Sequence, residues 1–168
     1  MRIPLSRPDI TEREIERVVD VLRSPNLSLG PVLAEFESAF AAYLGRRRAV
    51  AVNSGTSGLF LSLLALGIGE GDEVVTTPFT FIASTTTIMM TGARPVFVDI
   101  DPASLNLDPK RTEAAISERT KALLPVAVFG NPTGFDAICR IARQRHLPVV
   151  ENSCEALGSA LNGQKAGT

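Results

Sequence analysis

The sequence has few of the residues that usually bind metal ions. Its single histidine is His146, and its two cysteines are Cys139 and Cys154. The cysteines lack the spacing of a metal site, and we expect buried thiols rather than a disulfide. His146 closes a predicted helix, where a cation interacts favourably with the carboxyl end of the helix dipole, so its interpretation is structural. The sequence therefore predicts no metal site.

Long apolar runs and charge of one sign are also missing. The longest apolar candidate, residues 59–66, lies between glycines and is too short to span a bilayer. The first residues contain no apolar segment of the signal-peptide kind. The formal net charge is -1 and there is no sustained basic face, which argues against nucleic acid as a partner. We therefore expect a cytoplasmic protein that binds neither a membrane nor nucleic acid.

The composition that remains, 45% hydrophobic and 21% charged residues, is that of a soluble globular protein. Two helices are predicted first. Thr11 and Glu14 form a capping box before apolar residues at helical spacing. A second helix begins at Pro31 and stops at Gly45.

Beyond these helices, short β-rich runs alternate with helical stretches. The runs lie at residues 49–52, 73–76, 95–98, 122–128 and 148–150, and the helical stretches near 56–66, 81–91, 109–117 and 134–146. This alternation is typical of βαβ units, so the pattern predicts an α/β fold with a mostly parallel sheet flanked by helices. No composition shift marks a boundary, and we expect one unit over residues 1–168, with N-terminal helices in 1–45 and βα repeats in 46–168.

The turn at residues 53–58 joins the first predicted strand to a helix and is rich in small donors. Its glycines let the backbone approach an anion, and the hydroxyl groups of Ser54, Thr56 and Ser57 can donate to it. The following helix directs its unpaired N–H groups at the same point. The turn indicates a phosphate site, although the same residue types also make ordinary turns and N-caps.

Unusual residues follow the other predicted strands as well. They are residues 77–81, Asp99 and Asp101, residues 129–131 and residues 151–153. In open α/β sheets, ligands bind beyond the carboxyl ends of the strands, so we expect these loops to converge at one edge. We assign Asp99 and Asp101 a structural role without catalysis, because acidic groups at a strand end commonly cap the next turn.

Several motifs follow one another along nearly the whole chain. They are GPVLAEF at 30–36, NSGTS at 53–57, GEGDEV at 69–74, PFTFIAS at 78–84, GARPVFVDID at 92–101 and VVENSCEA at 149–156. In this order they resemble the DegT/DnrJ/EryC1/StrS family of sugar aminotransferases, which use pyridoxal 5′-phosphate (PLP) and have the fold type I aminotransferase fold. The resemblance implies the N-terminal part of the large domain, with the C-terminal small domain absent from these residues.

The resemblance also implies roles for individual residues. Gly55 and Thr56, with Ser54 beside them, would bind the cofactor phosphate of PLP or of pyridoxamine 5′-phosphate (PMP). Phe81 would lie against the face of the pyridine ring, whereas the residue alone would suggest a core phenylalanine. Glu155 falls near the cofactor's phenolic oxygen, where an anion is unfavourable unless it is protonated or paired, so we expect at most a contact.

Asn152 departs from the family pattern. The family has an aspartate there, whose charge pairs with the protonated pyridine nitrogen and makes the ring an electron sink. An amide can form a hydrogen bond to a ring nitrogen but supplies no charge. The difference predicts slow or altered chemistry, with Asn152 still a cofactor contact.

The family's reaction needs a lysine that anchors the cofactor and moves a proton. This sequence has three lysines, Lys110, Lys121 and Lys165. None matches the family lysine, whose motif would lie beyond Thr168. We therefore predict no catalytic residue among these 168 and expect the chain alone to be inactive.

The resemblance implies transamination of a nucleotide-linked keto sugar in amino-sugar biosynthesis, with glutamate as the amino donor. Three alternatives stay open: a PLP-dependent deoxysugar dehydratase of the same family, a non-catalytic PLP- or phosphate-binding module, and an unrelated phosphate-binding α/β enzyme. Because the family is dimeric with shared sites, we expect a homodimer or association with a completing chain.

Overall fold

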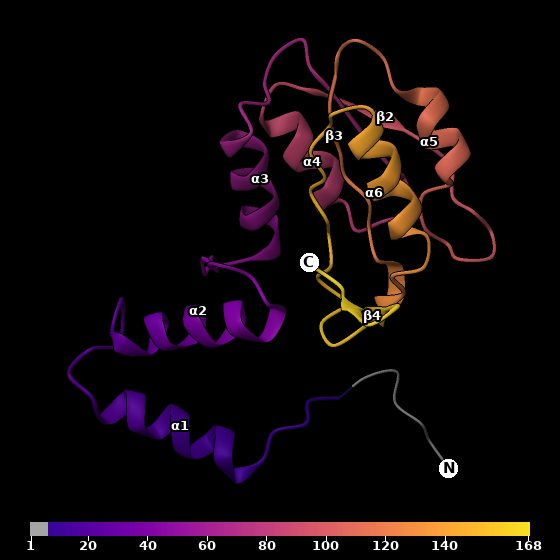
Figure 1. Cartoon of the computed structure of the whole chain (residues 1–168). Coiled ribbons are helices and arrows are strands. Elements are labelled where there is room, and N and C mark those ends of the chain that lie inside the picture. The colour runs from indigo at the N-terminus through magenta and orange to yellow at the C-terminus, as the bar shows by residue number, and fades with distance from the viewer. Residues whose placement is uncertain (1–6) are drawn as a thin grey trace. The chain divides into compact units, whose positions relative to one another are not determined.

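The computed structural model describes residues 7–168 and divides the chain into two compact units, one up to Ala51 and one from Val52 onward (Figure 1). The first unit contains α1 (Glu12–Arg23) and α2 (Pro31–Leu44). The second contains the sheet and the remaining helices. None of the helices in the described part of the chain is long and apolar enough to cross a bilayer.

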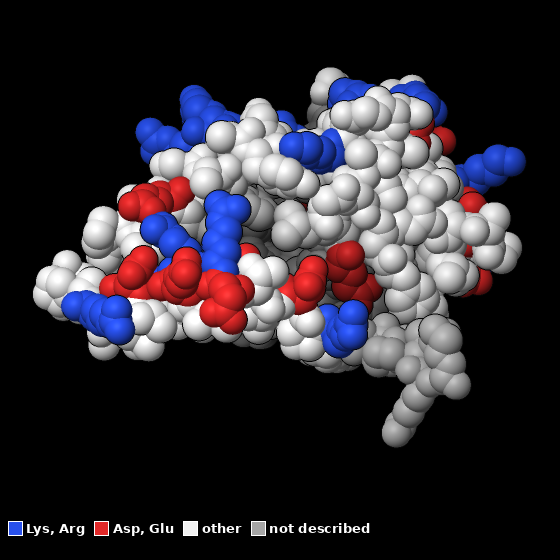
Figure 2. Space-filling model, turned by 90° about the horizontal axis from the view of Figure 1, so that it is seen from below, with Lys and Arg blue, Asp and Glu red and all other residues white. Residues whose placement is uncertain are grey.

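Both helices of the first unit begin as predicted. The backbone N–H of Thr11 donates to the Glu14 carboxylate at 2.7 Å, which confirms the capping box. Gly45 ends α2 with a φ of 65°, a left-handed conformation that glycine adopts without steric cost. Seen from below, several acidic side chains lie in a row on the surface, with basic side chains beside them (Figure 2).

The second unit is a three-stranded parallel sheet with helices. Its strands are β1 (Glu73–Thr76), β2 (Arg94–Phe97) and β3 (Thr120–Leu123), in the order β2-β1-β3. The α-helices of this unit are α3 (Gly55–Ala65) before β1, α4 (Ala83–Met90) and α5 (Pro109–Ala115) between the strands, and α6 (Phe135–Gln144) after β3. The predicted α/β fold with a parallel sheet is therefore confirmed.

Successive residues of β1 enter two different cores, because side chains alternate across a strand. Val74 packs with Leu63 of α3 and Ile88 of α4. Val75 packs with Leu123 of β3 and Ile138 of α6. The central strand β1 is thus buried on both faces, whereas the edge strand β2 is partly exposed.

Three strand predictions need correction. Residues 49–52 form no strand in the described part of the chain, and Val50 is 79% exposed, because no neighbouring strand pairs with this segment. The predicted strand at 122–128 lies instead at Thr120–Leu123, shortly before Pro125, which has no N–H to donate. Residues 148–150 pair with β3 only through an isolated parallel bridge between Leu123 and Val149.

A short hairpin follows, made of β4 (Ala160–Leu161) and β5 (Gln164–Lys165). Its turn residues Asn162 and Gly163 have φ angles of 52° and 80°, the conformation that two-residue hairpins favour. Lys165 therefore lies on this short hairpin.

Glu73 ties the amino ends of all three strands together. Its side chain is only 3% exposed and accepts hydrogen bonds from Arg94 of β2 at 2.6 Å and from the Ser117 hydroxyl at 2.7 Å. Arg119, just before β3, donates to it at 2.8 Å. The Arg94 and Ser117 hydrogen bonds, with a further contribution from Arg119, lower the pKa of Glu73 to about 2. The ionised carboxylate therefore stabilises the folded sheet.

This lowered pKa gives the stability a defined pH dependence. The contribution of Glu73 is fully present above its ordinary pKa of 4.5 and is lost as the pH falls towards 2. We expect Glu73→Gln to unfold at a lower temperature than the unsubstituted chain at pH 6, and the gap to narrow between pH 4.5 and pH 2. Thermal unfolding across this range checks it, with the exposed Glu70→Gln as the matched control. A gap that stays constant with pH would contradict the assignment.

Candidate functional site

A cavity of about 550 Å³ lies at the carboxyl edge of the sheet in the second unit. Its size falls within the range of roughly 300–1,000 Å³ that small-molecule sites occupy. Its lining comes from the start of α3, from the loops after β1 and β3, and from the segment around residue 152. The expected convergence is therefore confirmed for these segments but not for the loop after β2. Asp99 and Asp101 do not line the cavity, and Asp101 accepts from the backbone of Ala103 at 3.0 Å, as a turn cap does.

The amino end of α3 opens towards this cavity. Ser54 is the N-cap residue, and its hydroxyl oxygen accepts from the Ser57 backbone N–H at 3.1 Å. Within residues 7–168, no hydrogen bond uses the N–H groups of Gly55 and Thr56, the next two residues. Gly55 and Thr56 both line the cavity, whereas Ser54 supports the turn beside it. The helix therefore presents two unpaired donors and its positive end to an anion.

Gly55 lies close to the side chain of Cys154. A Cβ atom at this position would lie 2.6 Å from the sulfur of Cys154. Cys154 lines the cavity and is exposed, so its predicted burial is wrong, because it lies in the loop beyond residue 152 rather than in the core. Cys139 is partly buried on α6, where desolvation raises the pKa of its thiol, and neither cysteine forms a disulfide.

Asn152 forms the polar floor of the cavity and is 7% exposed. Its backbone is fixed beside β3 by bonds to Pro125 and Ala127, at 2.9 and 3.0 Å. Its side-chain amide donates to the Ser84 hydroxyl at 2.9 Å, and its carbonyl oxygen accepts from the Cys154 N–H at 3.3 Å. The amide keeps one N–H and one lone pair for a ligand.

Ser84 extends this network to the neighbouring loop. Its hydroxyl lies 2.9 Å from that of Thr80, and either of the two hydroxyl groups can donate. Ser84 itself is fully buried at the start of α4. Asn152 is therefore held by two parts of the chain that are far apart in sequence. Its side chain is bonded to Ser84 of α4, and its backbone is bonded to the segment after β3.

Phe81 and Glu155 also line the cavity. The Phe81 ring is 74% exposed, so it is not the core residue that its type alone suggests. The Glu155 carboxylate accepts from the backbone N–H of Phe129 at 3.0 Å. This hydrogen bond gives the Glu155 carboxylate a partner, which an anion at this position needs.

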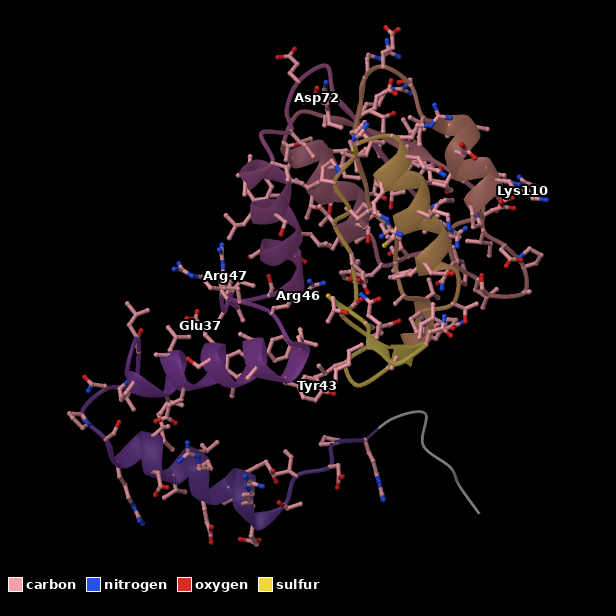
Figure 3. The ribbon with its side chains drawn as sticks, viewed as in Figure 1. Glu37, Tyr43, Arg46, Arg47, Asp72 and Lys110 are labelled. Atoms are coloured by element: carbon pink, nitrogen blue, oxygen red, sulfur yellow. The ribbon has the colours of Figure 1, made fainter. Side chains whose placement is uncertain are left out.

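The three lysines do not line the cavity. Lys110 is on α5 and points away from the sheet (Figure 3). Lys121 is an exposed residue of β3, and Lys165 belongs to β5. Across residues 7–168, no group of three or more His, Cys, Asp or Glu side chains is placed to hold a metal ion.

The sequence was compared with known protein families. A family model described as the DegT/DnrJ/EryC1/StrS aminotransferase family matches residues 8–168. The chain belongs to this family. It spans less than half the length of the curated relatives that it matches.

Individual members of the DegT/DnrJ/EryC1/StrS family show the extent of the likeness. GDP-perosamine synthase of Caulobacter vibrioides is 41% identical over 168 residues, which cover 99% of this chain and 45% of the relative. The structure of S. venezuelae DesV is 43% identical with a TM-score of 0.84, covering 94% of this chain and 42% of DesV. The PMP form of the sugar aminotransferase Spr1654 from Streptococcus pneumoniae is 36% identical with a TM-score of 0.94, covering 100% of this chain and 46% of Spr1654.

Sequence reasoning missed several cavity residues of this family member. Ser84 and Thr80 lie inside a recognised motif, yet the bond between Ser84 and Asn152 depends on tertiary contact. Phe79 and Phe129 line the cavity with their rings 6.1 Å apart. The sequence indicated that both phenylalanines lie in loops that follow strands. It did not indicate which side chains of those loops face the cavity.

Proposed function

We propose that this chain is the cofactor-binding part of a PLP-dependent aminotransferase that acts on a nucleotide-linked keto sugar, with glutamate as the amino donor. The observation that carries the proposal is one cavity that brings together an anion-binding helix end, an exposed aromatic ring and a buried amide. Family membership and the names of relatives such as GDP-perosamine synthase support the substrate class. We further propose a cytoplasmic protein that works as a homodimer or with a completing chain.

The residues present fit the phosphate of PLP. Gly55 and Thr56 offer two backbone donors at a helix start, and both residues line the cavity. The Thr56 hydroxyl adds a side-chain donor at the cavity, and Ser54, the N-cap residue, orders the helix start beside it. Helix starts of this kind bind phosphates widely, because N–H groups and the helix dipole act together.

The remaining cavity residues fit the ring of the cofactor. Phe81 offers a flat apolar surface that would hold the pyridine ring and exclude water. Asn152 would contact the ring nitrogen through its free N–H or its free lone pair, and Ser84 keeps the amide in place. Bound PLP supplies an electron sink for the carbon that loses a proton. We assign the proton-moving lysine to none of the three lysines, because none lines the cavity.

The phosphate assignment predicts a result that separates phosphate from ring binding. Thr56→Val combined with Ser54→Ala should weaken PMP binding by about 10- to 100-fold, since hydrogen bonds to charged groups contribute roughly 1.5–3 kcal/mol. Binding of pyridoxamine, which lacks the phosphate, should change little. Isothermal titration of both ligands measures this, with Ser62→Ala on α3 as the control. Equal losses for the two ligands would show that the substitutions damage the fold instead.

A second candidate function is a non-catalytic PLP-binding module. The neutral Asn152 and the absence of a lysine from the cavity lining favour it. Borohydride reduction of the chain with PLP, followed by intact-mass and peptide analysis, tests the binding module. A PLP adduct on one specific lysine would count against it, whereas reversible binding without any adduct is expected of both functions, because none of the three lysines lines the cavity.

A further inference from the structure

Phe129 adopts a backbone conformation that residues with a Cβ avoid. Its φ and ψ are 52° and 27°, in the left-handed region, and Gly130 follows with a φ of 79°. Burial of the ring does not offset this strain, because the side chain is 75% exposed. Strain of this kind persists only where the surroundings enforce it, and it concentrates at functional sites.

Contacts with the segment 155–159 hold the backbone of Phe129 in this conformation. The Glu155 carboxylate accepts from the Phe129 N–H at 3.0 Å. The Ser159 hydroxyl donates to the Gly130 carbonyl at 2.6 Å. A Cβ on Gly130 would lie 2.9 Å from the Glu155 carbonyl oxygen, so the two backbones are in close contact. The segment 155–159 therefore fixes the direction in which the Phe129 side chain leaves the turn.

The Phe129 side chain leaves the turn towards the cavity, where its ring forms part of the lining. Phe129 meets Phe79 edge to face, with the two ring planes at 84°. Both rings line the cavity and both are exposed, Phe79 by 41%. An exposed aromatic pair contributes little to folding, but it offers a ligand apolar surface in a fixed orientation.

We propose that Phe129 is a ligand-contacting residue of this cavity and that Glu155 is its positioning residue. The inference rests on the proposed function and concerns the pyridine ring of PMP, which would contact the wall formed by Phe79 and Phe129. Glu155 thereby acts through the Phe129 turn rather than through its own contact with the cofactor.

Substitutions at position 129 separate the ring from the strain. Phe129→Gly removes both, so it should bind PMP about three- to tenfold more weakly while unfolding at the same or a higher temperature. Phe129→Leu keeps the strain and removes the ring, so it should bind more weakly without that gain in thermal stability. Titration calorimetry and thermal unfolding measure both quantities. Unchanged PMP affinity in both variants would overturn the contact.

A double-mutant cycle tests the role of Glu155. Glu155→Leu should weaken PMP binding in the unsubstituted chain and have little further effect in the Phe129→Gly background. Glu155→Gln retains an acceptor for the Phe129 N–H and should restore most of the affinity. A loss of equal size in both backgrounds would instead indicate a direct contact and overturn the positioning role.

The two proposals fail differently. If PMP does not bind the unsubstituted chain, the proposed function fails and this inference fails with it. If PMP binds through its phosphate but the position 129 variants bind it equally well, the proposed function stands and only the aromatic contact is wrong.

Discussion

Asn152→Asp is expected to bind PMP roughly tenfold more tightly than the unsubstituted chain, a difference of about 1.4 kcal/mol. Position 152 lies at the floor of the cavity, where a carboxylate would pair with a protonated pyridine nitrogen. Charge-assisted hydrogen bonds are about twice as strong as neutral ones. The substitution adds a charge without adding volume, so the gain is electrostatic.

The same variant should be less stable when no ligand is bound. Residue 152 is 7% exposed, so an unpaired carboxylate there is poorly solvated and its pKa should rise. Ser84 can donate its own hydroxyl to the new carboxylate, and the Cys154 N–H remains a donor. These two bonds reduce the penalty but do not replace a positive partner.

A PMP analogue without the ring nitrogen provides the control. The 1-deaza analogue keeps the phosphate and the ring shape, so it should bind the Asn152→Asp variant no better than the unsubstituted chain. Calorimetric titration of both ligands against both proteins gives four affinities to compare. Equal gains for PMP and its 1-deaza analogue would show that Asn152 does not face the ring nitrogen.

Ile88→Ala should lower the free energy of unfolding by about 2–5 kcal/mol, as large-to-small substitutions in a packed core do. Ile88 is fully buried on α4, in the core that contains Leu63 of α3 and Val74 of β1. Removing its side-chain carbons leaves a cavity between the helices and the sheet. Because α4 also carries Ser84, the loss should be accompanied by weaker PMP binding.

The adjacent Met89 supplies the matched control. Its side chain is 60% exposed, so Met89→Ala should change the free energy of unfolding by no more than about 0.5 kcal/mol. Urea unfolding followed by circular dichroism measures both variants. Similar losses at the two positions would mean that α4 is not packed against the sheet as the structure shows.

Features that depend on neighbours in sequence could be predicted. The α1 capping box, the start of α2 at Pro31 and the turn at residues 53–58 that begins α3 involve residues a few positions apart, and their residue types limit the local backbone. The parallel sheet could be predicted because buried strands need continuous apolar residues. The segment 49–52 has the same composition, yet it forms no strand, since pairing also requires a partner.

Features that depend on distant contacts could not be predicted. Asn152 and Ser84 are 68 positions apart and meet only because the sheet brings their loops together. The left-handed backbone of Phe129 is imposed by Glu155 and Ser159, and phenylalanine carries no local signal for it. The exposed thiol of Cys154 was missed for the same reason, because its surroundings are set by the α3 helix.

The position of Glu73 has a consequence for how this sheet can diverge. The ion pairs of Glu73 hold the amino ends of the strands, whereas the ligand cavity lies at their carboxyl ends. Mutations that arise at the cavity therefore leave this anchor intact. An amide in place of an acid at position 152 can therefore change the chemistry of the cavity. Meanwhile, the ion pairs of Glu73 stabilise the fold from the opposite edge of the sheet.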